Sequence, residues 1–452
     1  MIKVLKRLAK PLLAAIPFMI ISCANPNRTP AEHGIRNVTT IAESFGDGEK
    51  VSVVIVEYPV ELDASSVGPE CFAVQGRKVV YARTNSIAEN TDASRHGRFV
   101  VLGLAYENKW EAAGANLFAG PRHDAEKDGG AQKGRGNGPR FEDDGKPVDL
   151  SATVVQTADI RAADGAVIPA SSSSRRSTSS KELVIQDFDK HYFTDSETGI
   201  TLPYFVFLPK GYDKARKYPM VFFIPDASAD TSIETATLTQ GNGATIWATP
   251  EEQAKHPSIV VAVQYPFAVV KEFGAMTLDD HLWTKGLTAV HNLLLHLIET
   301  LAVDRDRVYG TGQSQGCMAN IAISDRYPDL FAAQYLVAGQ WDVAEMAAMK
   351  DKKLWILVCE GDSKAYPAMC EAMELWKSLG AKAVKGEAFW NPKATGGEMA
   401  SNVRAMLEKD ADIRMNVLAG GSHMYTWSIA YGIEGIRDWM FAQSRDAQRG
   451  ED

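Results

Sequence analysis

One serine lies in a sequence context that suits a catalytic nucleophile. Ser314 lies within Gly310-Thr311-Gly312-Gln313-Ser314-Gln315-Gly316, directly after the strand-like Arg307-Val308-Tyr309 and directly before residues 317–322, which favour a helix. A Gly-x-Ser-x-Gly turn between a strand and a helix strains its serine and exposes the hydroxyl. Glycines flank it because a Cβ at these positions would collide with the neighbouring strand or helix. The pattern therefore predicts that Ser314 is a nucleophile.

A serine nucleophile needs a general base, and the downstream sequence offers a single histidine. Of the nine histidines in the chain, only His423 follows Ser314. It lies in the glycine-rich segment 418–427, just after the strand-like run 413–418. In the order Ser…Asp/Glu…His that α/β-hydrolases use, the base lies C-terminal to the nucleophile. We therefore predict that His423 is the base, the alternative being a histidine of a surface loop.

The acid that orients the histidine should follow a strand that lies between nucleophile and base in the chain. Residues 354–359 form such a strand, and Glu360-Gly361-Asp362 is its exit. Asp362 is the preferred acid, because a short carboxylate after glycine can point back toward the sheet edge and fix the histidine tautomer. Asp342, after the preceding strand, is the second choice and Glu360 the third.

An oxyanion hole needs two backbone N–H groups that point at one oxygen atom. Gln315, directly after the nucleophile, is one expected donor, and Ala227, in the loop after the strand 220–224, is the other. The aromatic residues Trp341, Tyr425 and Trp427 lie near expected loop ends at the same edge of the sheet. They are candidates for the lining of an acyl or alcohol pocket, with core packing as the alternative.

Composition divides the remainder of the chain into two domains. Short runs rich in valine and aromatic residues within 46–168 predict a small β-sandwich. The serine-rich residues 169–181 read as a linker. From 182 to 445, strand-like and helix-like runs alternate, which predicts an α/β domain with a mostly parallel sheet and helices on both faces.

The first residues resemble a targeting segment. Residues 1–22 combine four basic residues with a short apolar run, which is typical of a signal peptide, and Ile20-Ile21-Ser22-Cys23 resembles the lipobox of bacterial lipoproteins. This reading makes Cys23 an acylated N-terminus and residues 23–45 a flexible tether at the bacterial cell envelope. The outer membrane is the expected site, with the enzyme facing the periplasm or the surface, and an ordinary secretory signal is the alternative.

Charge and cysteine content exclude some classes of function. Without residues 1–22 the chain keeps 44 basic residues against 57 acidic ones, a formal net charge of −13. An acidic chain without long basic runs argues against a nucleic-acid partner. Four further cysteines, Cys71, Cys317, Cys359 and Cys370, have no metal-ligand spacing, although one pair could form a disulfide in the periplasm.

The resemblance to a known family lies in four segments of the second domain, 217–223, 303–314, 326–333 and 423–427. These segments resemble a branch of secreted esterases near polyhydroxybutyrate depolymerases and feruloyl esterases. The order of the two domains resembles esterases with an immunoglobulin-like (Ig-like) N-terminal domain. The resemblance implies an α/β-hydrolase fold, hydrolysis of carboxylic esters without a cofactor, and a triad at Ser314, Asp362 and His423.

Two departures from this family pattern concern the surroundings of the nucleophile. Pro225-Asp226 stands where related enzymes usually have His-Gly, which places a carboxylate next to the expected oxyanion donor. Cys317 stands where many members have a second glycine.

Three functions remain open at this point. The first is a lipid-anchored serine carboxylesterase that acts on a small ester or an ester-decorated polymer. The second is a serine peptidase of the prolyl-oligopeptidase type, and the third is a non-catalytic binding lipoprotein on a hydrolase scaffold. The natural acyl group, the alcohol and the oligomeric state are left undetermined by the sequence.

Overall fold

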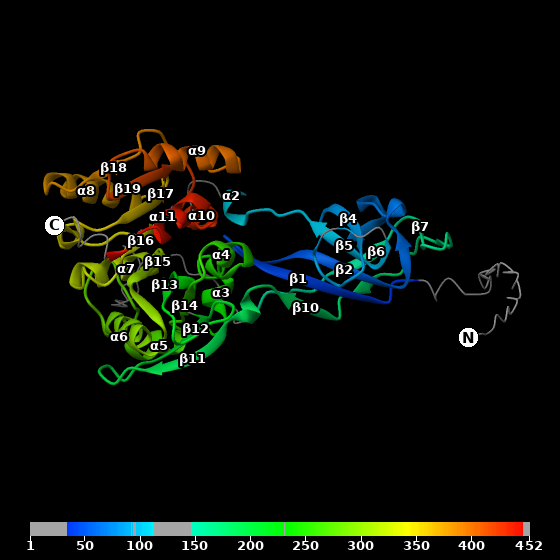
Figure 1. The fold of residues 1–452 in the computed structure, drawn as a ribbon, viewed down its shortest axis with the longest axis horizontal. Coiled ribbons are helices and arrows are strands. Elements are labelled where there is room, and N and C mark those ends of the chain that lie inside the picture. The colour runs from blue at the N-terminus through cyan, green and yellow to red at the C-terminus, as the bar shows by residue number, and fades with distance from the viewer. Residues whose placement is uncertain (1–33, 92, 94–95, 113–145, 230, 446–452) are drawn as a thin grey trace, which may run out of the picture.

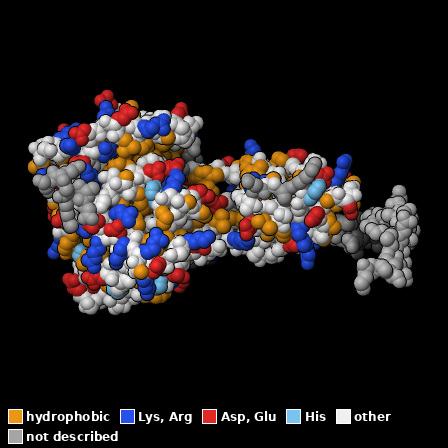
Figure 2. All heavy atoms as spheres, viewed as in Figure 1, with side chains coloured by type: hydrophobic (Ala, Val, Ile, Leu, Met, Phe, Trp, Pro, Cys, Tyr) orange, Lys and Arg blue, Asp and Glu red, His pale blue; other side chains and the backbone are white. Residues whose placement is uncertain are grey.

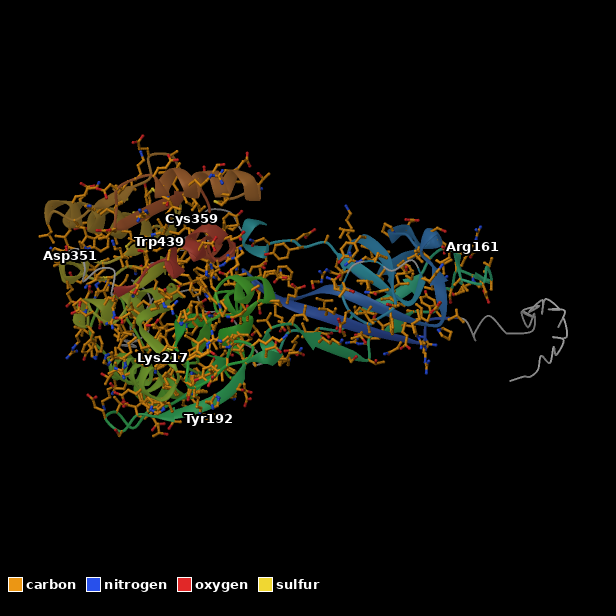
Figure 3. All side chains as sticks on the ribbon, in the orientation of Figure 1. Arg161, Tyr192, Lys217, Asp351, Cys359 and Trp439 are labelled. Carbon is orange, nitrogen blue, oxygen red and sulfur yellow. The ribbon has the colours of Figure 1, made fainter. Side chains whose placement is uncertain are left out.

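The protein consists of two domains joined end to end. The computed structural model describes residues 34–445 except 92, 94–95, 113–145 and 230. Figure 2 shows a broad C-terminal lobe and a narrower N-terminal lobe. Arg161 lies at the end of the N-terminal lobe that is remote from the other domain, whereas Cys359 and Trp439 lie in the C-terminal lobe (Figure 3). The predicted signal peptide 1–22 and Cys23 lie outside the described residues.

The N-terminal domain is built from mostly antiparallel strands that pack around their own core. A five-stranded sheet has the order β10-β1-β2-β5-β4, and a three-stranded sheet has the order β3-β6-β9. Side chains from both sheets, such as Val54, Leu102 and Val154, form one buried cluster. The strands are β1 (Asn37–Phe45), β2 (Gly48–Asp63), β3 (Phe72–Val74), β4 (Val79–Asn85), β5 (His96–Leu104), β6 (Thr153–Gln156), β7 (Ile160–Arg161), β8 (Val167–Ile168), β9 (Arg175–Arg176) and β10 (Ser179–Glu182).

Two segments that we expected to be flexible are parts of this sandwich. The predicted tether 23–45 is wrong over its last nine residues, because Asn37–Phe45 is strand β1 and pairs along its length with β2. The predicted linker 169–181 contains β9 and the start of β10. Its serine-rich composition suggested a coil, but Thr39↔Ser179 and the pairs that follow form a parallel ladder with β1. Backbone pairing at a sheet edge therefore orders a stretch whose side chains are mostly exposed.

The C-terminal domain is the α/β domain that the alternating pattern predicted. Its nine-stranded sheet has the order β11-β12-β14-β13-β15-β16-β17-β19-β18. The neighbours from β14 to β18 pair in parallel, and β11 and β12 are antiparallel. The strands are β11 (Asp189–Thr194), β12 (Thr201–Phe207), β13 (Tyr218–Ile224), β14 (Ile259–Val263), β15 (Val303–Gln313), β16 (Ala333–Val337), β17 (Leu354–Cys359), β18 (Ala383–Lys385) and β19 (Ile413–Leu418).

Helices cover both faces of this sheet, and each face has its own apolar cluster (Figure 1). The last helical stretch of the domain, residues 423–441, is divided into two helices by a turn at Tyr431-Gly432-Ile433. The α-helices of the described residues are α2 (Lys109–Ala112), α3 (Ala236–Thr239), α4 (Pro250–Lys255), α5 (Phe267–Phe273), α6 (Lys285–Thr300), α7 (Gln315–Arg326), α8 (Ala365–Ser378), α9 (Gly396–Leu407), α10 (His423–Ala430) and α11 (Glu434–Phe441). In the described part of the chain, no helix is long and apolar enough to span a membrane.

The hairpin of β1 and β2 extends from the N-terminal domain to the C-terminal one (Figure 1). At its tip, a Cβ on Gly46 would lie 2.3 Å from the carbonyl oxygen of Ser428 in α10, so the two backbones touch. Ser44 donates a hydrogen bond to the carbonyl of Leu238, and Asn108 donates one to the Ser428 hydroxyl. The N-terminal domain is therefore held against the C-terminal domain at α3 and α10.

Candidate active site

The segment around Ser314 has the geometry of a strained turn between a strand and a helix. β15 ends at Gln313 and α7 begins at Gln315, so Ser314 is the single residue between them. Its φ of 50° and ψ of −117° are values that side-chain-bearing residues seldom adopt. A Cβ on Gly312 would lie 2.5 Å from the Ile224 carbonyl oxygen, and one on Gly316 would lie 1.9 Å from it. Both glycines are therefore required for close packing against β13.

The structure brings Ser314, His423 and Asp362 together from the ends of three strands. The Ser314 hydroxyl lies 2.7 Å from Nε2 of His423, and Nδ1 of the same ring lies 2.6 Å from Oδ2 of Asp362. Asp362 follows β17, and His423 begins α10 after β19. With a proton on Nδ1, the imidazole donates to the carboxylate and accepts from the serine, which is the arrangement needed for general-base catalysis.

The surroundings of Asp362 keep it ionised. Its side chain is buried, which alone would disfavour the charged form, but attraction to His423 and the hydrogen bond from its ring outweigh this and lower the pKa. The backbone N–H groups of Ala365 and Lys364 donate to Oδ1 and lower the pKa further. These donors also fix the carboxylate in one orientation, because each of its oxygens has a defined partner.

Two glycines and a serine set the position of His423. Gly420 and Gly421 have φ values of 59° and 69°, and Ser422 caps the first turn of α10 by accepting from the backbone N–H of Tyr425. The Trp427 ring, one turn further along the helix, meets the imidazole edge-on with a centroid distance of 5.1 Å. The imidazole is therefore held by its own helix as well as by Asp362.

The other two acids considered for the triad have different partners. Asp342 accepts a hydrogen bond from the backbone N–H of Ala344, and Glu360 accepts one from that of Gly420. The imidazole of His423 has its carboxylate bond to Asp362, so the geometry favours that residue as the acid. Through its hydrogen bond with Gly420, Glu360 instead connects the loop after β17, which carries Asp362, to the glycine-rich loop before His423.

The two expected oxyanion donors each begin a helix that follows a strand by one or two residues. Gln315 is the first residue of α7, and Ala227 is the first residue of a short 3-10 helix (Ala227–Ala229) that follows β13. The first N–H groups of a helix have no acceptor within that helix, which leaves them available for an anion. The close approach of Gly316 to Pro225, whose carbonyl oxygen would lie 2.7 Å from a Cβ on the glycine, brings the two segments together.

Of the three aromatic residues considered for a pocket, Trp341 alone lines a cleft. A cavity of about 790 Å³ lies between the loop after β16, the loop that carries His281, and α8. Gln340, Trp341 and Asp342 belong to its wall, and the Gln340 side chain donates a hydrogen bond to Asp279. Tyr425 and Trp427 belong instead to the apolar cluster under α10 and are not among the residues that line the cleft.

Among the described residues, one set of side chains could hold a metal ion, and it includes none of the proposed triad residues. The set consists of Glu252, His256 and Asp438. These residues belong to α4, its C-terminal end and α11, and Arg437 already pairs with Glu252. Cys71, Cys317, Cys359 and Cys370 are free thiols.

Comparison with known proteins agrees with this architecture. Residues 37–169 match the family model described as the esterase Ig-like N-terminal domain. A crystal structure of a thermostable esterase has 25% sequence identity and a TM-score of 0.69, and the match covers 91% of this chain and 100% of that one. The chain has an α/β-hydrolase fold with an Ig-like N-terminal domain. The fold expected from the sequence is thereby confirmed, and the similarities support a carboxylic ester hydrolase.

More distant structures match about half of the chain. A feruloyl esterase module from Clostridium thermocellum has 14% identity and a TM-score of 0.37 over 56% of this chain and 85% of that one. An S-formylglutathione hydrolase from Staphylococcus aureus has 12% identity and a TM-score of 0.34 over 56% of this chain and 96% of that one. At these scores the matches add nothing to the assignment. A search of curated proteins gives no significant match.

Proposed function

We propose that the protein is a serine carboxylesterase in which Ser314 is the nucleophile, His423 the base and Asp362 the acid. The observation that carries this proposal is the continuous pair of short hydrogen bonds from Asp362 through His423 to a serine with a strained backbone. The similarity over nearly the full chain to a thermostable esterase supports an ester rather than another acyl substrate.

The geometry suits a two-step acyl transfer. His423 Nε2 removes the hydroxyl proton as Ser314 Oγ attacks the ester carbonyl, and the tetrahedral oxygen receives hydrogen bonds from the N–H groups of Gln315 and Ala227. Collapse breaks the bond to the alcohol, which leaves with the proton from His423. Water then repeats the sequence on the acyl-enzyme, releases the carboxylic acid and restores Ser314. The residues named here supply each of these steps without a cofactor.

We also propose a class of substrate and a location for the enzyme. The proposed substrate is a small ester or the ester-bearing branch of a polymer. The cleft beside Trp341 is a candidate for its binding, because its wall includes Gln340, the neighbour of Gly339, and a Cβ on Gly339 would lie 3.1 Å from the carbonyl oxygen of Ser314. Acylation of Cys23 after removal of residues 1–22 would anchor the enzyme at the bacterial cell envelope. The order of the chain is consistent with this, since β1 begins only at Asn37, fourteen residues after Cys23.

The test combines a covalent probe with matched substrates. Purified protein should react with a fluorophosphonate and hydrolyse nitrophenyl esters of short acids, and the Ser314→Ala variant should do neither while it remains folded. Nitroanilides of the same acids should be poor substrates; if they are cleaved as well as the esters, the peptidase is the correct assignment. A wild-type protein that neither reacts with the probe nor turns over any ester would point to a non-catalytic binding protein.

A further inference from the structure

A carboxylate lies beside the proposed oxyanion hole, where a negative charge would oppose catalysis if it faced the reacting oxygen. Asp226 directly precedes Ala227, and its side chain is only 4% exposed. An isolated charge that is so well buried is costly, so its partners define what it does. Its hydrogen-bond partners belong to the oxyanion loop and to the nucleophile turn, and Lys109 of α2 is a cation with which it interacts electrostatically.

Asp226 joins these two segments by two short hydrogen bonds. Oδ2 accepts from Nε2 of Gln313 at 2.6 Å, and Oδ1 accepts from the backbone N–H of Ser228 at 2.6 Å. Gln313 is the residue directly before the nucleophile, and its side chain is fully buried. The carboxylate therefore spans the gap between the residue before Ser314 and the residue after Ala227.

The same loop is supported from its other side. The Ser228 hydroxyl lies 2.6 Å from Oε1 of Gln240, and a Cβ on Gly241 would lie 3.2 Å from the carbonyl oxygen of Gly46 at the tip of the N-terminal hairpin. The oxyanion loop thus lies between the nucleophile turn and the region where the two domains meet. Within the described part of the chain, Oε1 of Gln313 has no hydrogen-bond partner, so the bond from Nε2 to the carboxylate is what holds this side chain.

We propose that Asp226 and Gln313 are positioning residues that set the distance between the oxyanion donor at Ala227 and the nucleophile at Ser314. This inference rests on the proposed esterase function. Both carboxylate oxygens accept hydrogen bonds, and these bonds stabilise the negative charge. The Pro225-Asp226 pair, which differs from the family pattern, therefore holds the oxyanion loop in place through Asp226. Charged hydrogen bonds are stronger than neutral ones, which suits a contact that must hold a loop during turnover.

An exchange of donor and acceptor tests this role. Gln313→Glu places two carboxyl groups at hydrogen-bond distance, so they can bond only while they share a proton. We expect kcat for a nitrophenyl ester to fall about tenfold or more, because a bond to a charged group is lost, and the loss should grow as pH rises. In the double variant with Asp226→Asn, the new amide can donate to the introduced carboxylate and still accept from Ser228. This variant should recover kcat to within about threefold of the wild type and lose the added pH dependence.

A matched control introduces a buried carboxylate elsewhere in the same sheet. Gln334 on β16 is similarly buried and accepts from the Ser324 hydroxyl, away from the oxyanion loop. Gln334→Glu should lower the melting temperature but leave kcat of the folded protein and its pH profile unchanged. Affinity for a trifluoromethyl ketone, which forms a tetrahedral adduct, should fall in parallel with kcat in Gln313→Glu and recover in the double variant.

The outcomes separate this inference from the proposed function. If the wild type turns over esters but Gln313→Glu keeps wild-type kcat and ketone affinity, the positioning role is wrong and the esterase assignment stands. If the double variant is no better than Gln313→Glu alone, the direct contact is not what matters, and the positioning role is again wrong. If the wild type shows neither turnover nor fluorophosphonate labelling, the proposed function itself fails.

Discussion

Replacement of Asp362 by asparagine gives the sharpest test of the proposed triad, because it keeps the size of the side chain and removes its charge. In the structure Oδ1 already accepts from Lys364 and Ala365, so the asparagine oxygen should occupy that position. The new amide N–H₂ then faces Nδ1 of His423 and can only donate to it. The imidazole must place its proton on Nε2, which turns the atom that should accept from Ser314 into a donor.

The expected loss follows from this change of tautomer. A histidine in the wrong tautomer cannot remove the serine proton, and the corresponding substitution in serine proteases lowers kcat about 10⁴-fold. A loss of about 10³- to 10⁴-fold corresponds to about 4 to 5.5 kcal/mol of transition-state stabilisation. KM should change little, since Asp362 is buried and does not line the cleft.

The assay compares two aspartates under the same conditions. Initial rates with a nitrophenyl ester are measured for Asp362→Asn and Asp342→Asn, with circular dichroism to show that both are folded. Asp342→Asn should cost less than about tenfold, because the side chain caps a loop at the surface. If Asp342→Asn is the more damaging change, or Asp362→Asn keeps more than about a hundredth of the activity, the assignment of the acid is wrong.

The lowered pKa of Asp362 also predicts how stability depends on pH. A carboxyl group whose pKa is lower in the folded state stabilises the fold above its unfolded pKa of about 3.9. That contribution is lost as pH falls through the folded pKa. The difference in unfolding free energy between wild type and Asp362→Asn should therefore be larger at neutral pH than in acid. A difference that stays constant across this range would contradict the attribution to His423 and the backbone donors.

Three further changes test other parts of the molecule. His423→Ala should abolish turnover to the same extent as loss of the nucleophile, whereas His256→Ala should affect only melting temperature; equal loss of rate in both would refute the choice of base. Gly46→Ala should lower the melting temperature and kcat together, because its Cβ would lie 2.3 Å from the Ser428 carbonyl oxygen, and an unchanged protein would show that the domain contact can yield. Cys23→Ser should release the enzyme from the membrane fraction with unchanged specific activity, and mass spectrometry of the mature N-terminus shows directly whether Cys23 is acylated.

The candidate site residues could be located from the sequence because their chemistry is tied to local patterns. Ser314 was identifiable from two glycines that allow close backbone approach, and His423 from its place as the single histidine after the nucleophile. Asp362 required an assumption about which strand exit faces the base, and Asp342 stayed in competition until the distances were known. Chain order and turn chemistry were therefore sufficient for two positions, and tertiary geometry was needed for the third.

The parts that sequence patterns predicted poorly depend on pairing between distant segments. Residues 37–45 and 179–182 look polar or irregular in isolation, yet they become strands because each has a partner in the same sheet. The contact between Gln313 and Asp226 joins residues 87 positions apart, and neither residue type suggests the other. Tyr425 and Trp427 lie in the apolar cluster under α10, which corresponds to the core packing that we considered as the alternative to a pocket.

The placement of the Ig-like domain gives these long-range contacts a common purpose. Its hairpin tip presses on α10, the helix that begins with His423, and on the segment at Gly241 that supports the oxyanion loop. The two contacts are therefore with the helix that carries the base and with the segment that supports the oxyanion loop. In the chain, the first of these lies after the nucleophile and the second before it. A domain that only tethered the enzyme would have no need to touch both. The close backbone contact at Gly46 is consistent with a domain that fixes the spacing of the catalytic groups.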